Sequence, residues 1–158
     1  MMNIHIITLG KLKEVYFKEA SAEYEKRLSA YCELSIIELS PVKLSQNPSA
    51  SEIKTALEKE SGFIKAKMPK SFRIALCSEG ERFSSEGFER KLAQIAQTGN
   101  DISFIIGSSE GLSESVKESA GLLLSLSDMT FPHRLARIML LEQLYRVFTI
   151  QNNMKYHK

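Results

Sequence analysis

The stretch SFIIGSSEGLSES, residues 103–115, places an apolar run directly before two glycines and a group of serines. Ile102 to Ile106 predicts a buried strand, and Ser113 to Ala120 predicts a short helix. Between them, Gly107 and Gly111 leave the main chain bare, which suits a positive φ or a close approach to a ligand. In open parallel sheets, ligands bind beyond the carboxyl ends of the strands. The stretch therefore indicates either a ligand-binding loop or an ordinary strand–turn–helix junction.

Strands and helices alternate along the rest of the chain. Apolar runs predict five strands, and apolar residues at steps of three or four predict five helices. The expected strands are 3–9, 33–39, 72–77, 102–106 and the first half of 121–132. The expected helices are 11–31, one capped by Ser51, one capped by Ser84 or Ser85, 113–120, and a last one with Pro132 in its first turn. This order predicts an α/β fold, a mostly parallel sheet with helices on both faces, in a single domain over residues 1–158.

The composition is typical of a soluble globular protein. Of the 158 residues, 43% are hydrophobic and 25% are charged. No apolar run approaches the length of a membrane span, and the first ten residues lack the basic segment of a signal peptide. Cys32 and Cys77 have no CxxC pattern or neighbouring histidine, so we expect two ordinary thiols, no disulfide and no metal site. A reducing cytoplasm suits such a chain.

Charge is distributed unevenly along the chain, although the formal net charge is only +2. Residues 132–158 contain Arg134, Arg137, Arg146 and two lysines, against a single acid, Glu142. A basic end on a mildly acidic body suggests an anionic partner at the C-terminus. A solvated helix face would carry the same pattern, so charge alone leaves both interpretations open.

The glycine loop matches neither of two familiar nucleotide-binding patterns. A Walker A loop has lysine after its last glycine, where this chain has Leu112. A Rossmann fingerprint is GxGxxG near the N-terminus, whereas this loop is GxxxG in the second half of the chain. The third and fifth expected strands also end in loops, at 76–80 and 126–131. Three consecutive strand ends can surround one small-molecule pocket, which favours the ligand-binding interpretation.

Several motifs resemble those of one known family. They are LGKLKEVYFKEASAEYEKRLSAY (9–31), SSEG (84–87), FIIGSSEGL (104–112), LSDMTFPHRLARIMLLEQLYRVFTI (126–150) and the terminal YHK. Together they are similar, essentially end to end, to the RlmH family of SPOUT-superfamily methyltransferases, which act on N3 of a pseudouridine in bacterial 23S ribosomal RNA. The resemblance implies a C-terminal deep trefoil knot, S-adenosyl-L-methionine as cofactor, a homodimer, and the assembled ribosome as substrate.

The resemblance also implies which residues contact the cofactor. They are Leu76, Gly107, Leu126, Ser127, Asp128, Met129, Thr130 and Phe131, at the same three strand ends. Two positions depart from the family pattern. Ser108 stands where relatives have a second glycine, and serine would strain the loop there if the position requires a positive φ. Cys77 stands where relatives tend to have an acid.

Catalysis and RNA binding are expected near the C-terminus. His133 is the candidate general base by residue type, with hydrogen bonding to a main-chain carbonyl or to RNA as the alternative. Tyr156 and His157 could reach the opening of the cofactor site or stack on a base. The candidate catalytic residues are therefore His133, Arg134, Tyr156 and His157. The expected RNA contacts are Arg134, Arg137, Arg146 and Lys155. Arg134 and Arg137 could instead form an ion pair with Glu142 or with a neighbouring subunit.

Two other functions remain compatible with the sequence. A ribosome-associated protein of the same fold that has lost cofactor affinity would account for Ser108. A small-molecule enzyme that binds a nucleotide at the same strand ends would be active without RNA.

Overall fold

The computed structural model describes residues 1–157 as a five-stranded sheet with five helices, in alternating order. The strands are β1 (Met2–Leu9), β2 (Cys32–Leu39), β3 (Phe72–Arg82), β4 (Ile102–Ile106) and β5 (Leu122–Ser125). The helices are α1 (Val15–Leu28), α2 (Ala50–Lys67), α3 (Ser85–Ala96), α4 (Glu114–Ser119) and α5 (His133–Gln151). All neighbouring strands are parallel, in the order β2-β1-β4-β3-β5. The predicted parallel α/β fold is confirmed.

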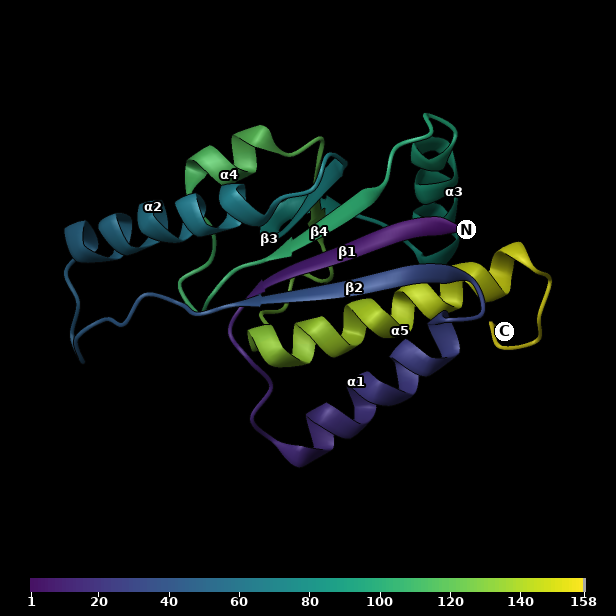
Figure 1. The fold of residues 1–158 in the computed structure, drawn as a ribbon, viewed down its shortest axis with the longest axis horizontal. Coiled ribbons are helices and arrows are strands. Elements are labelled where there is room, and N and C mark those ends of the chain that lie inside the picture. The colour runs from purple at the N-terminus through teal and green to yellow at the C-terminus, as the bar shows by residue number, and fades with distance from the viewer. Residues whose placement is uncertain (158) are drawn as a thin grey trace.

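Helices cover both faces of the sheet (Figure 1). On one face, α1, α3 and α5 pack against strand residues such as Ile4 and Phe104. On the other face, α2 and α4 pack against Ile7 and Ile105. All five residues of β4, in the middle of the sheet, are buried, which explains why four of them are apolar; the fifth, Ser103, has its hydroxyl paired with that of Ser71 at 2.6 Å. Each large side chain buried here contributes about 1.5–3 kcal/mol.

The β3–β5 pair contains the one irregularity that shapes the site. β3 pairs with β5 through Leu76, leaves it for four residues, and returns to the same β5 position at Glu81. Gly80 lies in this excursion, and a Cβ there would lie 2.6 Å from the main-chain carbon of Leu124. Only glycine lets the two main chains come this close. The predicted strand 72–77 is therefore five residues too short at its carboxyl end.

Several predicted helix boundaries differ from the structure. Ser49, not Ser51, caps α2, and its hydroxyl accepts the Glu52 N–H at 3.1 Å while the Glu52 carboxylate accepts the Ser49 N–H. Pro132 is the N-cap of α5 and precedes its first turn. Ser84 caps α3 as predicted. The helix predicted for 11–31 is shorter, Val15–Leu28, and the one predicted for 113–120 is Glu114–Ser119 with Ser113 as its cap.

Candidate active site

A cleft of about 820 Å³ lies at the carboxyl ends of β3, β4 and β5. Seven of the eight predicted cofactor residues line it, together with the candidate base His133; the seven are Leu76, Gly107, Leu126, Ser127, Met129, Thr130 and Phe131. Hydroxyl groups and main chain alternate with apolar side chains along the walls. Among the described residues that line the cleft there is no lysine or arginine, and Glu110 is an acid. The cleft therefore suits a largely neutral or cationic ligand.

The glycine loop closes on itself at the rim of the cleft. The Gly111 N–H donates to the Ser108 carbonyl at 2.9 Å, and Gly111 has a φ of +88°. A Cβ on Gly107 would lie 2.3 Å from the Gly111 carbonyl oxygen. Among residues 1–157, Asn153 is the one non-glycine residue with positive φ, so Ser108 carries no left-handed strain. The strain considered for serine at this position is absent.

Glu60, on α2, ties the glycine loop to a distant segment. Its side chain is buried, with 3% of the residue exposed, and it is absent from the cleft walls. The Ser108 hydroxyl donates to its Oε1 at 3.0 Å, and the Val42 N–H donates to its Oε2 at 2.9 Å. One carboxylate thus holds both the glycine loop and the β2–α2 loop. The sequence carries a signal for it, because Ala56, Glu60 and Ile64 are spaced by four on the buried face of one helix.

The segment after β5 forms a second wall of the cleft. The Ser127 hydroxyl accepts the Met129 N–H at 3.0 Å, and the Ser125 hydroxyl donates to the Ser127 carbonyl at 2.9 Å. Asp128 does not line the cleft; its side chain is 77% exposed and forms an ion pair with Arg82. The structure therefore places Asp128 on the outer side of this segment, away from the position expected of a direct cofactor contact.

His133 begins α5 beside both the cleft and the end of β1. It lines the cleft, and its Nε2 lies 3.6 Å from the position a Cβ would occupy on Gly10. Partial burial lowers the pKa of His133 below 6.5, and the positive charge of Arg134 lowers it further. The imidazole is therefore neutral at neutral pH and able to accept a proton.

Replacing His133 by glutamine is expected to reduce the loss of stability in mild acid. The unfolded chain protonates this histidine near pH 6.5 and the folded chain only at lower pH. Its contribution to stability is therefore complete above that value and declines as the pH falls below it. Urea unfolding at about pH 7.5 and about pH 5 should show a smaller difference in His133→Gln than in the wild type. An equal or larger difference would contradict the assignment.

The three predicted RNA-binding arginines of α5 all form ion pairs within the chain. Arg134 lies 2.9 Å from Glu14, Arg137 lies 2.7 Å from Glu38, and Arg146 lies 2.6 Å from Glu142. Arg137 is also buried, with 6% of the residue exposed. A phosphate contact by Arg137 would therefore require the pair with Glu38 to open. Lys155 is exposed.

The C-terminal segment folds back onto α5 and α3 rather than onto the cleft. The Tyr156 hydroxyl donates to Glu142 at 3.1 Å, and its ring lies 4.8 Å from the Tyr145 ring. Burial, followed by the bond to Glu142, raises the pKa of Tyr156 to about 12. His157 Nε2 lies 2.7 Å from Glu86, at the start of α3. Neither Tyr156 nor His157 lines the cleft, so neither residue contacts the cleft of its own chain.

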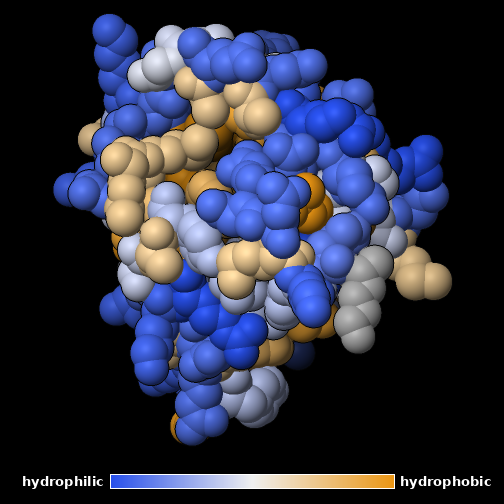
Figure 2. All heavy atoms as spheres, turned by 90° about the vertical axis from the view of Figure 1, so that its right-hand side faces the viewer, coloured by the Kyte–Doolittle hydropathy of each residue, from blue (hydrophilic) through white to orange (hydrophobic). Residues whose placement is uncertain are grey.

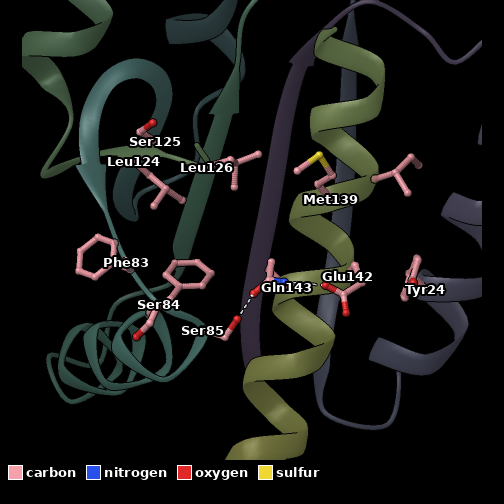
Figure 3. A pocket seen from close by; sticks show the side chains of 12 residues that line it. Tyr24, Phe83, Ser84, Ser85, Leu124, Ser125, Leu126, Met139, Glu142 and Gln143 are labelled. Carbon is pink, nitrogen blue, oxygen red and sulfur yellow. Dashed lines mark hydrogen bonds between the residues drawn. The ribbon is translucent and has the colours of Figure 1, made fainter. Parts of the chain in front are cut away.

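A second cavity, of about 420 Å³, lies beside the first between α3, α5 and the end of β5 (Figure 3). Its walls are mainly apolar, and it shares the lining residues Leu124, Ser125 and Leu126 with the cleft. Ser85 and Gln143 face each other across it and are hydrogen-bonded at 2.7 Å.

Figure 2 shows that the end of the molecule near the two termini is mostly hydrophilic, with smaller apolar areas between the polar side chains.

Among residues 1–157, no helix is both long enough and apolar enough to cross a membrane. No group of three His, Cys, Asp or Glu side chains comes together as a metal site within the same residues.

The family was established by comparison with known proteins. The pattern of the family described as Predicted SPOUT methyltransferase matches residues 2–157. Solved structures give the same fold: a probable methylase family protein from Haemophilus influenzae has a TM-score of 0.60 at 14% identity, covering 99% of this chain and 71% of the other. A probable methyltransferase from Bordetella pertussis has a TM-score of 0.54 at 14% identity, covering 92% and 93%. The chain belongs to the SPOUT methyltransferase family.

Sequence relatives narrow this assignment to one branch of the family. A protein of Leuconostoc mesenteroides named Ribosomal RNA large subunit methyltransferase H is 45% identical, covering 99% of this chain and all of its own. A protein of the same name from Streptococcus thermophilus is 47% identical with the same coverage. Within the SPOUT methyltransferases, the chain therefore falls among the RlmH proteins, as its sequence motifs predicted.

Proposed function

We propose that this protein transfers a methyl group from S-adenosyl-L-methionine to N3 of a pseudouridine in 23S ribosomal RNA, on the assembled ribosome. The observation that carries the proposal is the cleft that joins the ends of β3, β4 and β5, with His133 in its wall. The names of the relatives support ribosomal RNA as the substrate. An RNA substrate in turn favours the cytoplasm as the place of action.

The residues of the cleft fit the proposed cofactor. Its volume of about 820 Å³ lies within the range of about 300–1,000 Å³ typical of small-molecule sites. Main-chain groups at Gly107 and Leu126 and apolar side chains such as Leu76 suit an adenosine, which needs a flat apolar wall and main-chain hydrogen bonds. The walls contain Glu110 and, within the described chain, no lysine or arginine, so they do not repel a sulfonium or an ammonium group.

Catalysis then requires alignment and removal of one proton. The cofactor, when bound, supplies a methyl group on a positively charged sulfur, which is already a strong electrophile. The chain contributes by holding the acceptor nitrogen in line with that methyl and by excluding water. Neutral His133 is the proposed acceptor for the N3 proton, because it lies in the cleft wall and its pKa is lowered.

A homodimer would complete the site. Tyr156 and His157 lie outside the cleft of their own chain. We therefore propose that these two residues act at the cleft of a second copy. We also propose the trefoil knot of the family. Two features are compatible with a threaded C-terminal segment. β3 leaves β5 and returns to the same β5 position at Glu81, and α5 lies on the opposite face of the sheet from α4 (Figure 1).

The alternative of a binding protein without cofactor affinity has no support in the geometry of the glycine loop. Ser108 was the reason for considering it, and Ser108 has an ordinary φ and a hydrogen bond to Glu60. We therefore retain the enzymatic function alone.

Two measurements test the proposal. Isothermal titration with S-adenosyl-L-methionine should show binding to the purified protein in the micromolar range, about 8 kcal/mol. With labelled cofactor, ribosomes from a strain that lacks the gene should accept one methyl group, located by mass spectrometry on a pseudouridine of 23S RNA. Ribosomes that already carry the methyl group are the control. The proposal fails if the cofactor gives no heat, or if both ribosome preparations are labelled equally.

A further inference from the structure

The start of α1 and the loop before it carry an unusual set of exposed side chains. Lys11, Lys13 and Lys18 are all exposed, and so are Val15 and Tyr16, at 66% and 65%. Leu12, between the first two lysines, is buried. We call the five exposed residues Lys11, Lys13, Val15, Tyr16 and Lys18 the α1 patch.

The positive charge of the α1 patch is not used inside the chain. No ion pair among residues 1–157 involves Lys11, Lys13 or Lys18. The acid within the segment, Glu14, is engaged by Arg134 at 2.9 Å. Helix stability does not explain Lys18 either, because a positive charge in the first turn opposes the helix dipole. The three lysines therefore remain available to an external anion.

The α1 patch lies next to the rim of the cleft. Gly10 immediately precedes it and lies against His133, which lines the cleft. The pair Glu14–Arg134 joins the segment to the first turn of α5. A polyanion bound on the patch would thus extend past the candidate base.

We propose that the α1 patch binds ribosomal RNA beside the methylated nucleotide, the lysines contacting phosphates and Tyr16 stacking on an unpaired base. The proposal rests on the function proposed above and assigns its RNA contacts to residues other than the paired arginines of α5. Lysine next to an exposed aromatic ring is the combination that single-stranded nucleic acid favours. Symmetric contact with a second copy fits less well, because the same patch on both copies would bring lysines against lysines.

The test compares four proteins. They are the wild type, the triple variant Lys11→Gln/Lys13→Gln/Lys18→Gln, Tyr16→Ala, and a matched control with Lys54→Gln/Lys59→Gln/Lys65→Gln. The control lysines are also exposed, but they lie on α2, on the other face of the sheet. Each protein is assayed for methyl transfer to purified ribosomes that lack the modification, over a series of salt concentrations, and for cofactor binding by titration.

The triple variant should lose about tenfold or more in kcat/KM for ribosomes. The slope of log(kcat/KM) against the logarithm of the salt concentration should become less steep by about 2–3. Tyr16→Ala should lose about tenfold with an unchanged slope. The α2 control should match the wild type, and all four proteins should bind the cofactor equally. The proposal is overturned if the triple variant and the control behave alike. It is also overturned if the patch variants alone change the sedimentation mass, since the patch would then join two copies.

Failure of the proposed function gives a different result. If the wild type transfers no methyl group, direct binding of the four proteins to the same ribosomes, measured by co-sedimentation, still decides the role of the patch. Equal binding by all four would overturn it, and weaker binding by the two patch variants alone would support it.

Discussion

Gly107→Ala is expected to reduce the affinity for S-adenosyl-L-methionine by at least about 100-fold. The new Cβ would lie 2.3 Å from the Gly111 carbonyl oxygen and 3.0 Å from the Leu112 side chain. Main chain cannot yield as a flexible side chain can, so the loop must open at the end of β4. Leu112 belongs to the core, and its displacement should also cost about 1–3 kcal/mol of stability. Isothermal titration measures the first effect and urea unfolding the second.

Gly62→Ala is the matched control for this change. Gly62 lies within α2, and a Cβ there meets nothing within 4 Å. Alanine should stabilise the helix by about 0.5–1 kcal/mol and leave cofactor binding unchanged. If Gly107→Ala binds the cofactor as Gly62→Ala does, the closed form of the glycine loop is not the form that binds.

The position of the site could be predicted from sequence because it depends on strand ends. A strand as apolar as 102–106, in which Ser103 is the one polar residue, is expected inside a sheet, and parallel neighbours bring their carboxyl ends to one edge. Loops that follow three such strands then meet without further information. Gly107 and Leu126, at two of these strand ends, line the cleft, as the sequence predicts.

Two of the three ion pairs of α5, those of Arg134 and Arg137, could not be predicted in this way. The partners of Arg134 and Arg137 are Glu14 and Glu38, which lie 120 and 99 residues away in the chain. No local spacing indicates such pairs, since they depend on how α5 crosses β2 and the start of α1. The charge count therefore left open whether the C-terminal arginines are free; the structure pairs Arg134, Arg137 and Arg146 within the chain, whereas the lysines of the α1 patch form none of the ion pairs found among residues 1–157.

The start of α2, by contrast, was predictable from a pattern already in the sequence. A capping box needs an acid three residues after the serine. Glu52 is three residues after Ser49, whereas Lys54 is three residues after Ser51. Both serines carry a hydroxyl that can cap a helix, so the hydroxyl does not distinguish them. Only Ser49 has a glutamate three residues later whose carboxylate accepts the N–H of the capping residue.

Glu60→Ala is expected to weaken both the fold and the cofactor site. Removal of the carboxylate leaves the Val42 N–H and the Ser108 hydroxyl without their acceptor. Two partly buried donors without partners should cost about 2–4 kcal/mol in unfolding free energy. Because Ser108 lies in the cleft wall, its release should also lower the affinity for the cofactor by about tenfold or more. Urea unfolding and isothermal titration measure the two effects separately.

A double-mutant cycle with Ser108→Ala distinguishes positioning of the loop from general destabilisation. If Glu60 acts on the cofactor through Ser108, then Glu60→Ala should change the cofactor affinity little once residue 108 is alanine. Part of the loss of stability should persist in that background, because the Val42 N–H still lacks its acceptor. Glu60→Gln keeps one acceptor oxygen and should fall between the wild type and Glu60→Ala. A Glu60→Ala protein that is less stable but binds the cofactor normally would show that the carboxylate supports only the fold, and that the glycine loop keeps its shape without it.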